Sequence, residues 1–260
     1  MKQPPARILR GDRWGERLKK VVADASAGEM AWMQAHTELL KSDDYSRVGL
    51  LRLHDSSCYL KFYQSKSAGQ NMLFRFGYAR GLRSFDAATR LMEADVLVPA
   101  PLCCLALPGG MMLLTEGILD GRDLKALWQQ GIGDRQRALL MAGAGRALAK
   151  LHSAGYSHGD CKWSNFLWSA DNFYLVDLEA VKETSRGGKR QARDLARFTV
   201  NAEDLGVAPQ VYELFLERYL HGSNNSRAVI VRAMMPFLRQ LRRRHEKKYG
   251  KRGHEIVREH

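Results

Sequence analysis

The stretch that indicates the fold is His158-Gly159-Asp160-Cys161-Lys162-Trp163-Ser164-Asn165, and it is followed by Val176-Asp177-Leu178-Glu179. Asp160 can accept the proton of an attacking hydroxyl group. Asn165 and Asp177 offer the hard oxygen ligands that suit Mg²⁺ on nucleotide phosphates. Lys162, two residues after Asp160, can place positive charge on the transferring phosphoryl group. The spacing therefore predicts phosphoryl transfer from ATP, with Mg²⁺ as the second cofactor.

Three nearby residues have structural interpretations. We expect the His158 imidazole to pack under the loop and brace it rather than to transfer a proton. Asp194, in the helical pattern RQARDLARF, is a candidate to brace the same loop from a following helix. Cys161 lies beside the predicted base but is best explained as a small buried side chain.

This segment resembles the catalytic loop of the protein-kinase-like superfamily, H-R-D-x-K-x-x-N, with Gly159 in place of the arginine. VDLE stands where that superfamily has D-F-G, with Leu178 in place of the phenylalanine. The resemblance implies an α+β, bilobal protein-kinase-like fold with ATP bound between a strand-rich N-lobe and a helical C-lobe.

Carried upstream, the resemblance implies the residues that bind the nucleotide. Lys61, in the strand pattern CYLKFY, would grip the phosphates, and the backbone around Glu116 and Ile118 would hydrogen-bond adenine. The acidic partner of Lys61 would be Asp86 or Glu93, and we favour Asp86. No G-x-G-x-x-G motif precedes Lys61, so a glycine-rich loop over the phosphates is not indicated.

Within the superfamily, the chain resembles the lipopolysaccharide core kinases, which phosphorylate heptose or Kdo. The likeness covers about residues 45–200 and rests on the LKFY strand, the arginine-rich stretch 73–85, the V-P-x-P loop 98–101, LLTEGI and HGDCKWSN. It implies a γ-phosphoryl transfer to a sugar hydroxyl of the lipopolysaccharide inner core, with the core glycolipid as the acceptor.

Hydrophobic periodicity gives the order of elements. The patterns predict a helix over 14–41, a hairpin of strands 48–53 and 58–63, and a strand over 173–181. From residue 123 the patterns are mainly helical. We therefore predict three parts: a nucleotide-gripping lobe (1–118), a catalytic lobe (119–226) and a basic helical tail (227–260).

Composition indicates the class of protein and the compartment in which it works. Of 260 residues, 45% are hydrophobic and 27% charged, as in a globular protein. The four cysteines form no C-x-x-C pair, which argues against a disulfide framework or a zinc site and favours a reducing compartment. The N-terminal stretch does not read as a signal peptide. We expect a cytoplasmic protein, with the cytoplasmic face of the inner membrane as a peripheral location.

The net charge of +13 implies an anionic partner. Residues 227–260 contribute +8 of it, which suits attraction to an anionic inner leaflet. Arginines and aromatics alternate over 73–85, but no complete RNA-binding motif occurs, so nucleic acid is the less favoured partner.

Two alternatives stay open from the sequence. One is a small-molecule phosphotransferase of the aminoglycoside or choline kinase type, whose loops also read H-G-D-x-x-x-x-N. Lys162 and the basic charge count against it, since a cationic aminoglycoside would prefer an acidic acceptor site. The other is a non-catalytic pseudokinase that binds a partner or the membrane.

Overall fold

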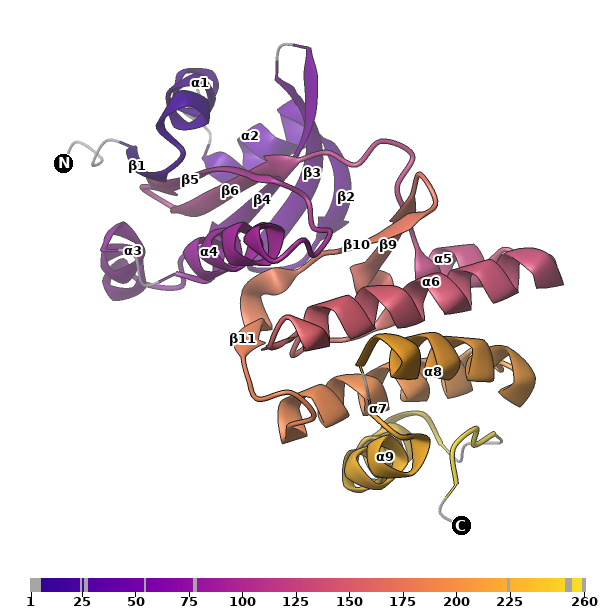
Figure 1. The fold of residues 1–260 in the computed structure, drawn as a ribbon. Coiled ribbons are helices and arrows are strands. Elements are labelled where there is room, and N and C mark those ends of the chain that lie inside the picture. Colours follow the sequence, from indigo (N-terminus) through magenta and orange to yellow (C-terminus); the bar gives the residue numbers. More distant parts are fainter. Residues whose placement is uncertain are drawn as a thin grey trace. The chain divides into compact units, whose positions relative to one another are not determined.

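The structure is a computed structural model that describes residues 6–23, 25, 28–53, 55–76, 79–223, 225–250 and 254–258. The chain divides into two compact units. Unit 1 comprises Met1–Met92 and Pro99–Leu119, and unit 2 comprises Glu93–Val98 and Asp120–His260. Unit 1 holds the large sheet and unit 2 most of the helices (Figure 1). The α+β fold with a strand-rich first part and a helical second part is therefore confirmed.

Unit 1 is built on a six-stranded sheet in which every neighbouring pair is antiparallel, in the order β1-β5-β6-β4-β3-β2. Its strands are β1 (Arg7–Arg10), β2 (Glu38–Ser42), β3 (Ser46–Leu53), β4 (Ser56–Gln64), β5 (Pro101–Leu107) and β6 (Gly110–Glu116). The predicted hairpin is the β3–β4 pair, whose turn includes His54, a residue outside the described ranges. Apolar strand residues joined by a short polar turn account for this pairing.

Helices cover both faces of this sheet (Figure 1). Alternate residues of β4, Cys58, Leu60 and Phe62, share a core with helices α1 (Asp12–Val22) and α2 (Glu29–His36). Successive strand residues point to opposite faces, so Lys61 belongs to the other face. On that face, helices α3 (Ala68–Arg75) and α4 (Arg80–Glu93) pack around a core that includes Cys104 and Met111.

The predicted single helix over 14–41 is wrong. Two helices occur there, and the second ends at His36 before the edge strand β2. Gly28, at the start of α2, has φ +91°, a backbone conformation that breaks a continuous helix and that glycine adopts readily. Thr37 then turns to extended backbone, which lets the chain pair with β3.

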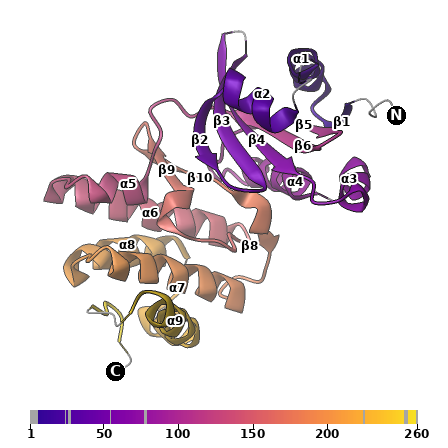
Figure 2. The same cartoon turned by 180° about the vertical axis from the view of Figure 1, so that it is seen from behind.

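Unit 2 contains five α-helices among the described residues, including the four longest, and Figure 2 shows them from behind. They are α5 (Leu124–Gln129), α6 (Asp134–Ser153), α7 (Lys189–Asp204), α8 (Pro209–Ser223) and α9 (Arg227–Tyr249). Helix α6 packs on α8, and α7 packs on α9. Between them lies an aromatic core in which Phe198 stacks on Phe215 at 4.1 Å between ring centroids and also contacts Trp163. Helix α9 begins at Arg227, the first residue of the predicted tail, and packs on α7 within unit 2, so a separate tail stays a prediction.

Short strands flank the predicted catalytic segment. Strands β9 (Phe166–Ser169) and β10 (Asn172–Leu175) form a hairpin with β7 (Arg122–Asp123) at its edge, and β8 (Tyr156–Ser157) pairs with β11 (Lys182–Glu183). Two single-turn 3₁₀ helices occur here: η1 (Trp163–Asn165) ends the stretch 158–165, and η2 (Leu178–Ala180) begins directly after Asp177. The strand predicted over 173–181 ends at Leu175 because Asp177 adopts φ +64°.

All four cysteines are free and buried, and they include Cys161, for which the sequence predicted burial. Among the residues that the structure describes, no helix combines the length and the apolar character needed to cross a membrane.

Candidate active site

The predicted catalytic loop, residues 158–165, runs from β8 through η1 to β9. His158 lies fully buried beneath it. Its Nε2 lies 3.1 Å from the carbonyl oxygen of Val176, and its Nδ1 lies 3.4 Å from the backbone nitrogen of Asp160. A neutral ring that donates from Nε2 and accepts at Nδ1 satisfies both contacts. Burial lowers the pKa of His158, which favours this neutral form, so the residue braces the loop as expected.

A second brace comes from Asp194 of α7, which is 2% exposed. Its two carboxylate oxygens accept the backbone N–H groups of His158 at 2.6 Å and Gly159 at 2.9 Å. The His152 ring nitrogen lies 3.3 Å from the same carboxylate. Charge-assisted hydrogen bonds to backbone are strong and directional. The expected brace by Asp194 is thus present.

Gly159 occupies the position at which the superfamily motif has arginine. It has φ +80°, and a Cβ atom built on it would lie 2.5 Å from the carbonyl oxygen of Ala180. Both the backbone conformation and the close approach require glycine. The departure from H-R-D therefore lets the 177–181 segment pack directly on the catalytic loop.

The predicted base, Asp160, is held between two cations. Lys162 Nζ lies 2.8 Å from Oδ2, and Arg197 Nη2 lies 2.9 Å from Oδ1. Burial acts to raise the pKa of Asp160, but the hydrogen bond and charge of Lys162, together with Arg197, outweigh it and lower the pKa. The carboxyl group is therefore ionised at neutral pH, the state in which it can accept a proton.

The two predicted metal ligands are joined through backbone. Asn165 donates from Nδ2 to the Asp160 carbonyl oxygen at 2.8 Å, and the Val176 N–H donates to the Asn165 carbonyl oxygen at 3.1 Å. Asp177 follows directly, in a left-handed conformation that aspartate tolerates better than most residues. These bonds fix the position of Asp177 against the loop that carries Asp160.

The donor types at this position fit Mg²⁺. The hydrogen bonds of the Asn165 side chain use its amide nitrogen, while Mg²⁺ binds amide and carboxylate oxygens. No cluster of three or more His, Cys, Asp or Glu side chains able to hold a metal occurs in the described part of the chain. One asparagine and one carboxylate therefore suit an ion that keeps most of its ligands from substrate phosphates and water.

In unit 1, Lys61 lies in the centre of the sheet, on β4, opposite Val48 of β3 and Leu113 of β6. Its Nζ lies 5.0 Å from the centre of the Tyr63 ring. A central strand holds the lysine on a rigid support, as phosphate positioning requires.

Asp86 of α4 pairs with Arg10. Arg10 of β1 donates to both carboxylate oxygens of Asp86, from Nε at 3.1 Å and from Nη2 at 3.5 Å. The structure thus ties Asp86 to the sheet edge, and an acidic partner for Lys61 on α4 stays a prediction.

The segment predicted to bind adenine leaves β6. The Glu116 N–H donates to the Ala100 carbonyl oxygen at 2.8 Å, and the Ile118 carbonyl accepts the Tyr59 hydroxyl at 3.0 Å. Glu116 uses its N–H, and Ile118 uses its carbonyl oxygen, in these two hydrogen bonds.

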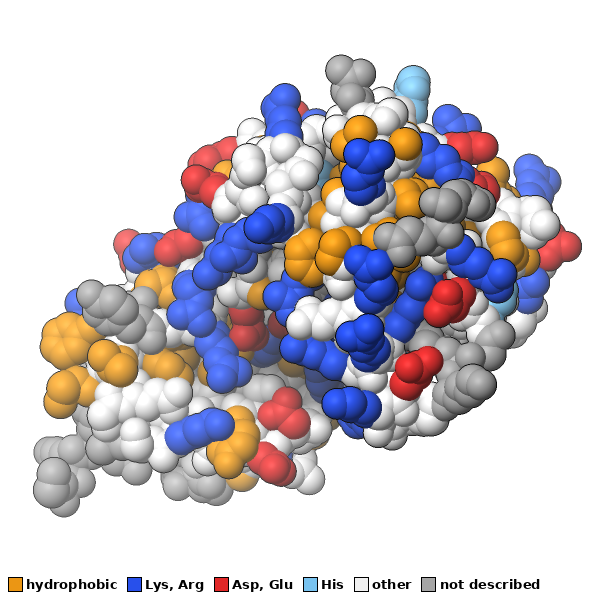
Figure 3. Space-filling view, turned by 90° about the horizontal axis from the view of Figure 1, so that it is seen from below, with side chains coloured by type: hydrophobic (Ala, Val, Ile, Leu, Met, Phe, Trp, Pro, Cys, Tyr) orange, Lys and Arg blue, Asp and Glu red, His pale blue; other side chains and the backbone are white. Residues whose placement is uncertain are grey.

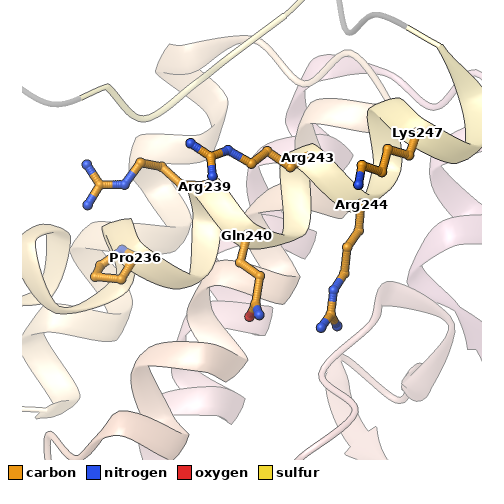
Figure 4. Close-up of a pocket in the computed structure, with 6 residues that line it drawn as sticks. All are labelled: Pro236, Arg239, Gln240, Arg243, Arg244 and Lys247. Atoms are coloured by element: carbon orange, nitrogen blue, oxygen red, sulfur yellow. The ribbon is translucent and has the colours of Figure 1, made fainter.

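An open hollow of about 400 Å³ lies elsewhere, along α9. Figure 4 shows Arg239 and Arg243 pointing one way from this helix, and Gln240 and Arg244 pointing another. The hollow contains none of the predicted site residues. A cationic surface of one helix offers no base, so we do not place the chemistry there.

Sequence reasoning missed Arg197. Its signal was the spacing to Asp194: residues three apart on a helix share a face, so a helix that braces the loop through Asp194 also presents Arg197 to it. The pattern RQARDLARF contains both residues.

Residues 158–165 form a braced loop that presents Asp160, Lys162 and Asn165, and Asp177 follows it, which is the arrangement expected of a kinase with a protein-kinase-like fold. Residues 31–219 match the family model described as "Lipopolysaccharide kinase (Kdo/WaaP) family". The chain belongs to this family, and it is therefore a kinase that uses ATP.

Two proteins match most of this chain, and a third matches a short stretch. The chain is 26% identical over 197 residues to "3-deoxy-D-manno-octulosonic acid kinase" of Vibrio parahaemolyticus. The matched region covers 72% of this chain and 74% of the relative. It is similar in fold to a solved structure described as "WaaP in complex with acyl carrier protein", with a TM-score of 0.60 and 19% identity over 94% of this chain and 99% of the other. A 36-residue match, 51% identical, links it to "Probable bifunctional tRNA threonylcarbamoyladenosine biosynthesis protein" of Methanocorpusculum labreanum, but covers only 14% of this chain and 7% of the relative.

Proposed function

We propose that this kinase transfers the γ-phosphoryl group of ATP to a hydroxyl group of an inner-core lipopolysaccharide sugar, with Kdo favoured over heptose. The observation that carries this proposal is the pair of cations, Lys162 and Arg197, on either side of the Asp160 carboxylate. The family and the relative named as a Kdo kinase support the substrate class.

The reaction needs one proton acceptor and an in-line attack. The acceptor hydroxyl oxygen bonds to the γ-phosphorus while the bond from that phosphorus to the ADP oxygen breaks. The hydroxyl proton passes to the Asp160 carboxylate, which the lowered pKa keeps ionised. Lys162 neutralises charge on the transferred group. The products are a sugar phosphate monoester and ADP.

The remaining predicted residues bind and orient the nucleotide. Lys61 positions the phosphates, and the carbonyl of Glu116 with the N–H of Ile118 are the proposed contacts for adenine. Asn165 and Asp177 would hold Mg²⁺, which supplies positive charge to the phosphates when bound.

The acceptor preference follows from charge. Kdo carries a carboxylate, whereas heptose is neutral. Arg197 uses one Nη atom on Asp160 and is about two-fifths exposed, so its planar guanidinium has further donors to offer an anion. The same two cations disfavour a cationic aminoglycoside acceptor.

The setting is a membrane surface, because the proposed acceptor is a glycolipid. The basic face of α9, which we define as Arg232, Arg239, Arg243, Arg244 and Lys247, is exposed and suits an anionic inner leaflet. Figure 3 shows many Lys and Arg side chains in this view, with Asp and Glu side chains between some of them. Each basic residue near such a surface contributes about 1 kcal/mol of attraction.

The test is transfer of labelled phosphate from Mg·ATP to lipid A precursors that end in Kdo or in heptose. We expect the Kdo acceptor to be phosphorylated, and Asp160→Asn to lower kcat by roughly 10²–10⁴-fold. Asp171→Asn, on the exposed turn between β9 and β10, is the matched control and should act as wild type.

Other outcomes would redirect the assignment. Preference for the heptose acceptor contradicts the role given to the two cations. Phosphorylation of choline or an aminoglycoside alone would point to the small-molecule phosphotransferases. No transfer to any acceptor, with no stabilisation of the protein by Mg·ATP, would indicate a pseudokinase.

A further inference from the structure

Helix α3 of unit 1 exposes three large apolar side chains that the catalytic proposal does not use. Met72 is 62% exposed, Leu73 52% and Phe76, directly after the helix, 68%. We call these three residues the α3 apolar patch. Figure 3 shows hydrophobic side chains on the surface at the left edge of the view, the edge at which α3 lies in Figure 1. Neighbouring exposed apolar side chains mark interaction sites more often than isolated ones do.

The helix is fixed with this patch facing outward. Phe74, between the exposed residues, is buried in the core that also holds Cys104 and Met111. The Asn71 side chain donates to the carbonyl oxygen of Pro108 in the β5–β6 turn. Ser67 caps the N-terminus of the helix by accepting the N–H of Gln70 at 3.2 Å. These contacts pack α3 against the sheet, and this packing leaves the α3 apolar patch exposed.

The charged residues next to the patch in the sequence have one sign. Residues 64–85 contain four Lys or Arg and no Asp or Glu. Lys66 before α3, and Arg80 and Arg83 in the first turn of α4, are exposed. Apolar side chains flanked by cations are the composition of helices that lie in the interface of an anionic membrane.

We propose that α3 inserts the α3 apolar patch into an anionic phospholipid bilayer, while Lys66, Arg80 and Arg83 contact lipid phosphates. A bilayer is the favoured occupant for two reasons. Three side chains are too few for a specific protein interface, which buries about 800 Å² on each partner, whereas an interfacial helix needs only a shallow apolar face. The proposal rests on the proposed function only in that a glycolipid acceptor places the enzyme at a membrane.

The apolar and the electrostatic contributions can be separated by salt, because salt screens charge and leaves apolar burial in place. The probe is a vesicle of phosphatidylglycerol and phosphatidylcholine without any acceptor, and binding is measured by flotation at low and at high salt. The test variant is Met72→Ser/Leu73→Ser/Phe76→Ser. The matched control is Leu139→Ser/Val229→Ser, which removes two exposed apolar side chains of unit 2.

We expect wild type and the control to stay on the vesicles at high salt and the α3 variant to be released, with an affinity at least about tenfold lower. A further variant, Arg243→Gln/Arg244→Gln/Lys247→Gln on the basic face of α9, should weaken binding at low salt only. Equal binding of the α3 variant and wild type at high salt would overturn the proposal.

A second measurement follows binding by a signal that appears on insertion, so that a variant that merely fails to fold cannot imitate the result. In Phe76→Trp, the added tryptophan emission should shift to the blue with anionic vesicles and be quenched by brominated lipid chains. Insertion into lipid would be overturned if the emission did not change when vesicles were added. It would also be overturned if the emission shifted when an acidic protein was added but not when vesicles were added.

Kinase assays separate this proposal from the proposed function. The α3 variant should phosphorylate a soluble, deacylated acceptor as wild type does, and should lose at least about fivefold in kcat/KM on acceptor embedded in vesicles. A wild type that binds vesicles through α3 but phosphorylates no core sugar would refute only the function. Equal losses on both acceptors would contradict the membrane role of α3.

Discussion

At the residue scale, the catalytic loop depends on the groups that surround Asp160. A carboxylate that must accept a proton has to stay ionised at the working pH, and burial opposes this. Lys162 and Arg197 reverse the effect of burial and lower the pKa of Asp160. We class Arg197 as a positioning residue for the base, in addition to the acceptor contact proposed above.

Removing Arg197 should change the pH dependence of the reaction. In Arg197→Gln one cause of the lowered pKa is lost, so the pKa of Asp160 rises and the acidic limb of the kcat/KM profile moves to higher pH. Activity should therefore fall more at pH 5.5 than at pH 8. The control is Arg193→Gln, an exposed arginine on the same helix. An acidic limb that does not move, with a uniform loss at every pH, would contradict the positioning role.

At the element scale, α7 and α9 hold the C-terminal segment through one buried ion pair. Arg242 of α9 donates from Nε to Glu203 of α7 at 3.1 Å and from Nη2 to the Val257 carbonyl oxygen at 2.7 Å. The Ile256 N–H donates to the same carboxylate at 3.1 Å. The pair thus joins two helices and the end of the chain.

Breaking this pair should be costly. Glu203→Ala removes the buried carboxylate partner of Arg242 and leaves it with the partly exposed Glu255 carboxylate, 3.3 Å from Nη1. We expect a loss of about 3 kcal/mol in the free energy of unfolding. Glu213→Ala removes the partner of Arg227 in an exposed pair and should cost less than about 1 kcal/mol. Urea denaturation of both variants checks the contrast. Equal losses would show that burial does not set the strength of these pairs.

At the scale of the whole molecule, the division into units does not follow the order of the sequence. Residues 93–98 lie between α4 and β5, two elements of unit 1, yet they group with unit 2. The Leu97 carbonyl oxygen accepts the N–H of Leu175 at 2.9 Å, and Val96 and Val98 on either side are buried. The segment is therefore part of the support of β10.

This assignment predicts where a substitution will act. Val96→Ala removes buried apolar volume and should lower the free energy of unfolding by about 2 kcal/mol. Because hydrogen exchange reports local stability, amide exchange should become faster in β10 and α6 more than in β1–β3. Val229→Ala, at an exposed position, is the control. Faster exchange confined to the unit 1 sheet would contradict the assignment of residues 93–98.

Local patterns were sufficient for much of this fold. The β3–β4 hairpin, the helices from residue 123 onward and the order of the catalytic residues follow from periodicity and spacing, because each depends on neighbours a few residues apart. The same is true of the brace by Asp194, whose helix was recognisable. The helix predicted over 14–41 failed for two reasons: Gly28 adopts a conformation that breaks the helix, and residues 38–42 pair with the next strand, β3.

By itself, the sequence determined the class of chemistry: Asp160, Lys162, Asn165 and Asp177 stand at the spacing that phosphoryl transfer requires. Only the tertiary structure decided which cations flank the base, that Asp86 pairs with Arg10, why position 159 must be glycine and which apolar side chains of α3 remain exposed. The physical reason is the range of the interactions. A motif records residues close in the chain, whereas ion pairing, close packing and exposure depend on segments that only folding brings together.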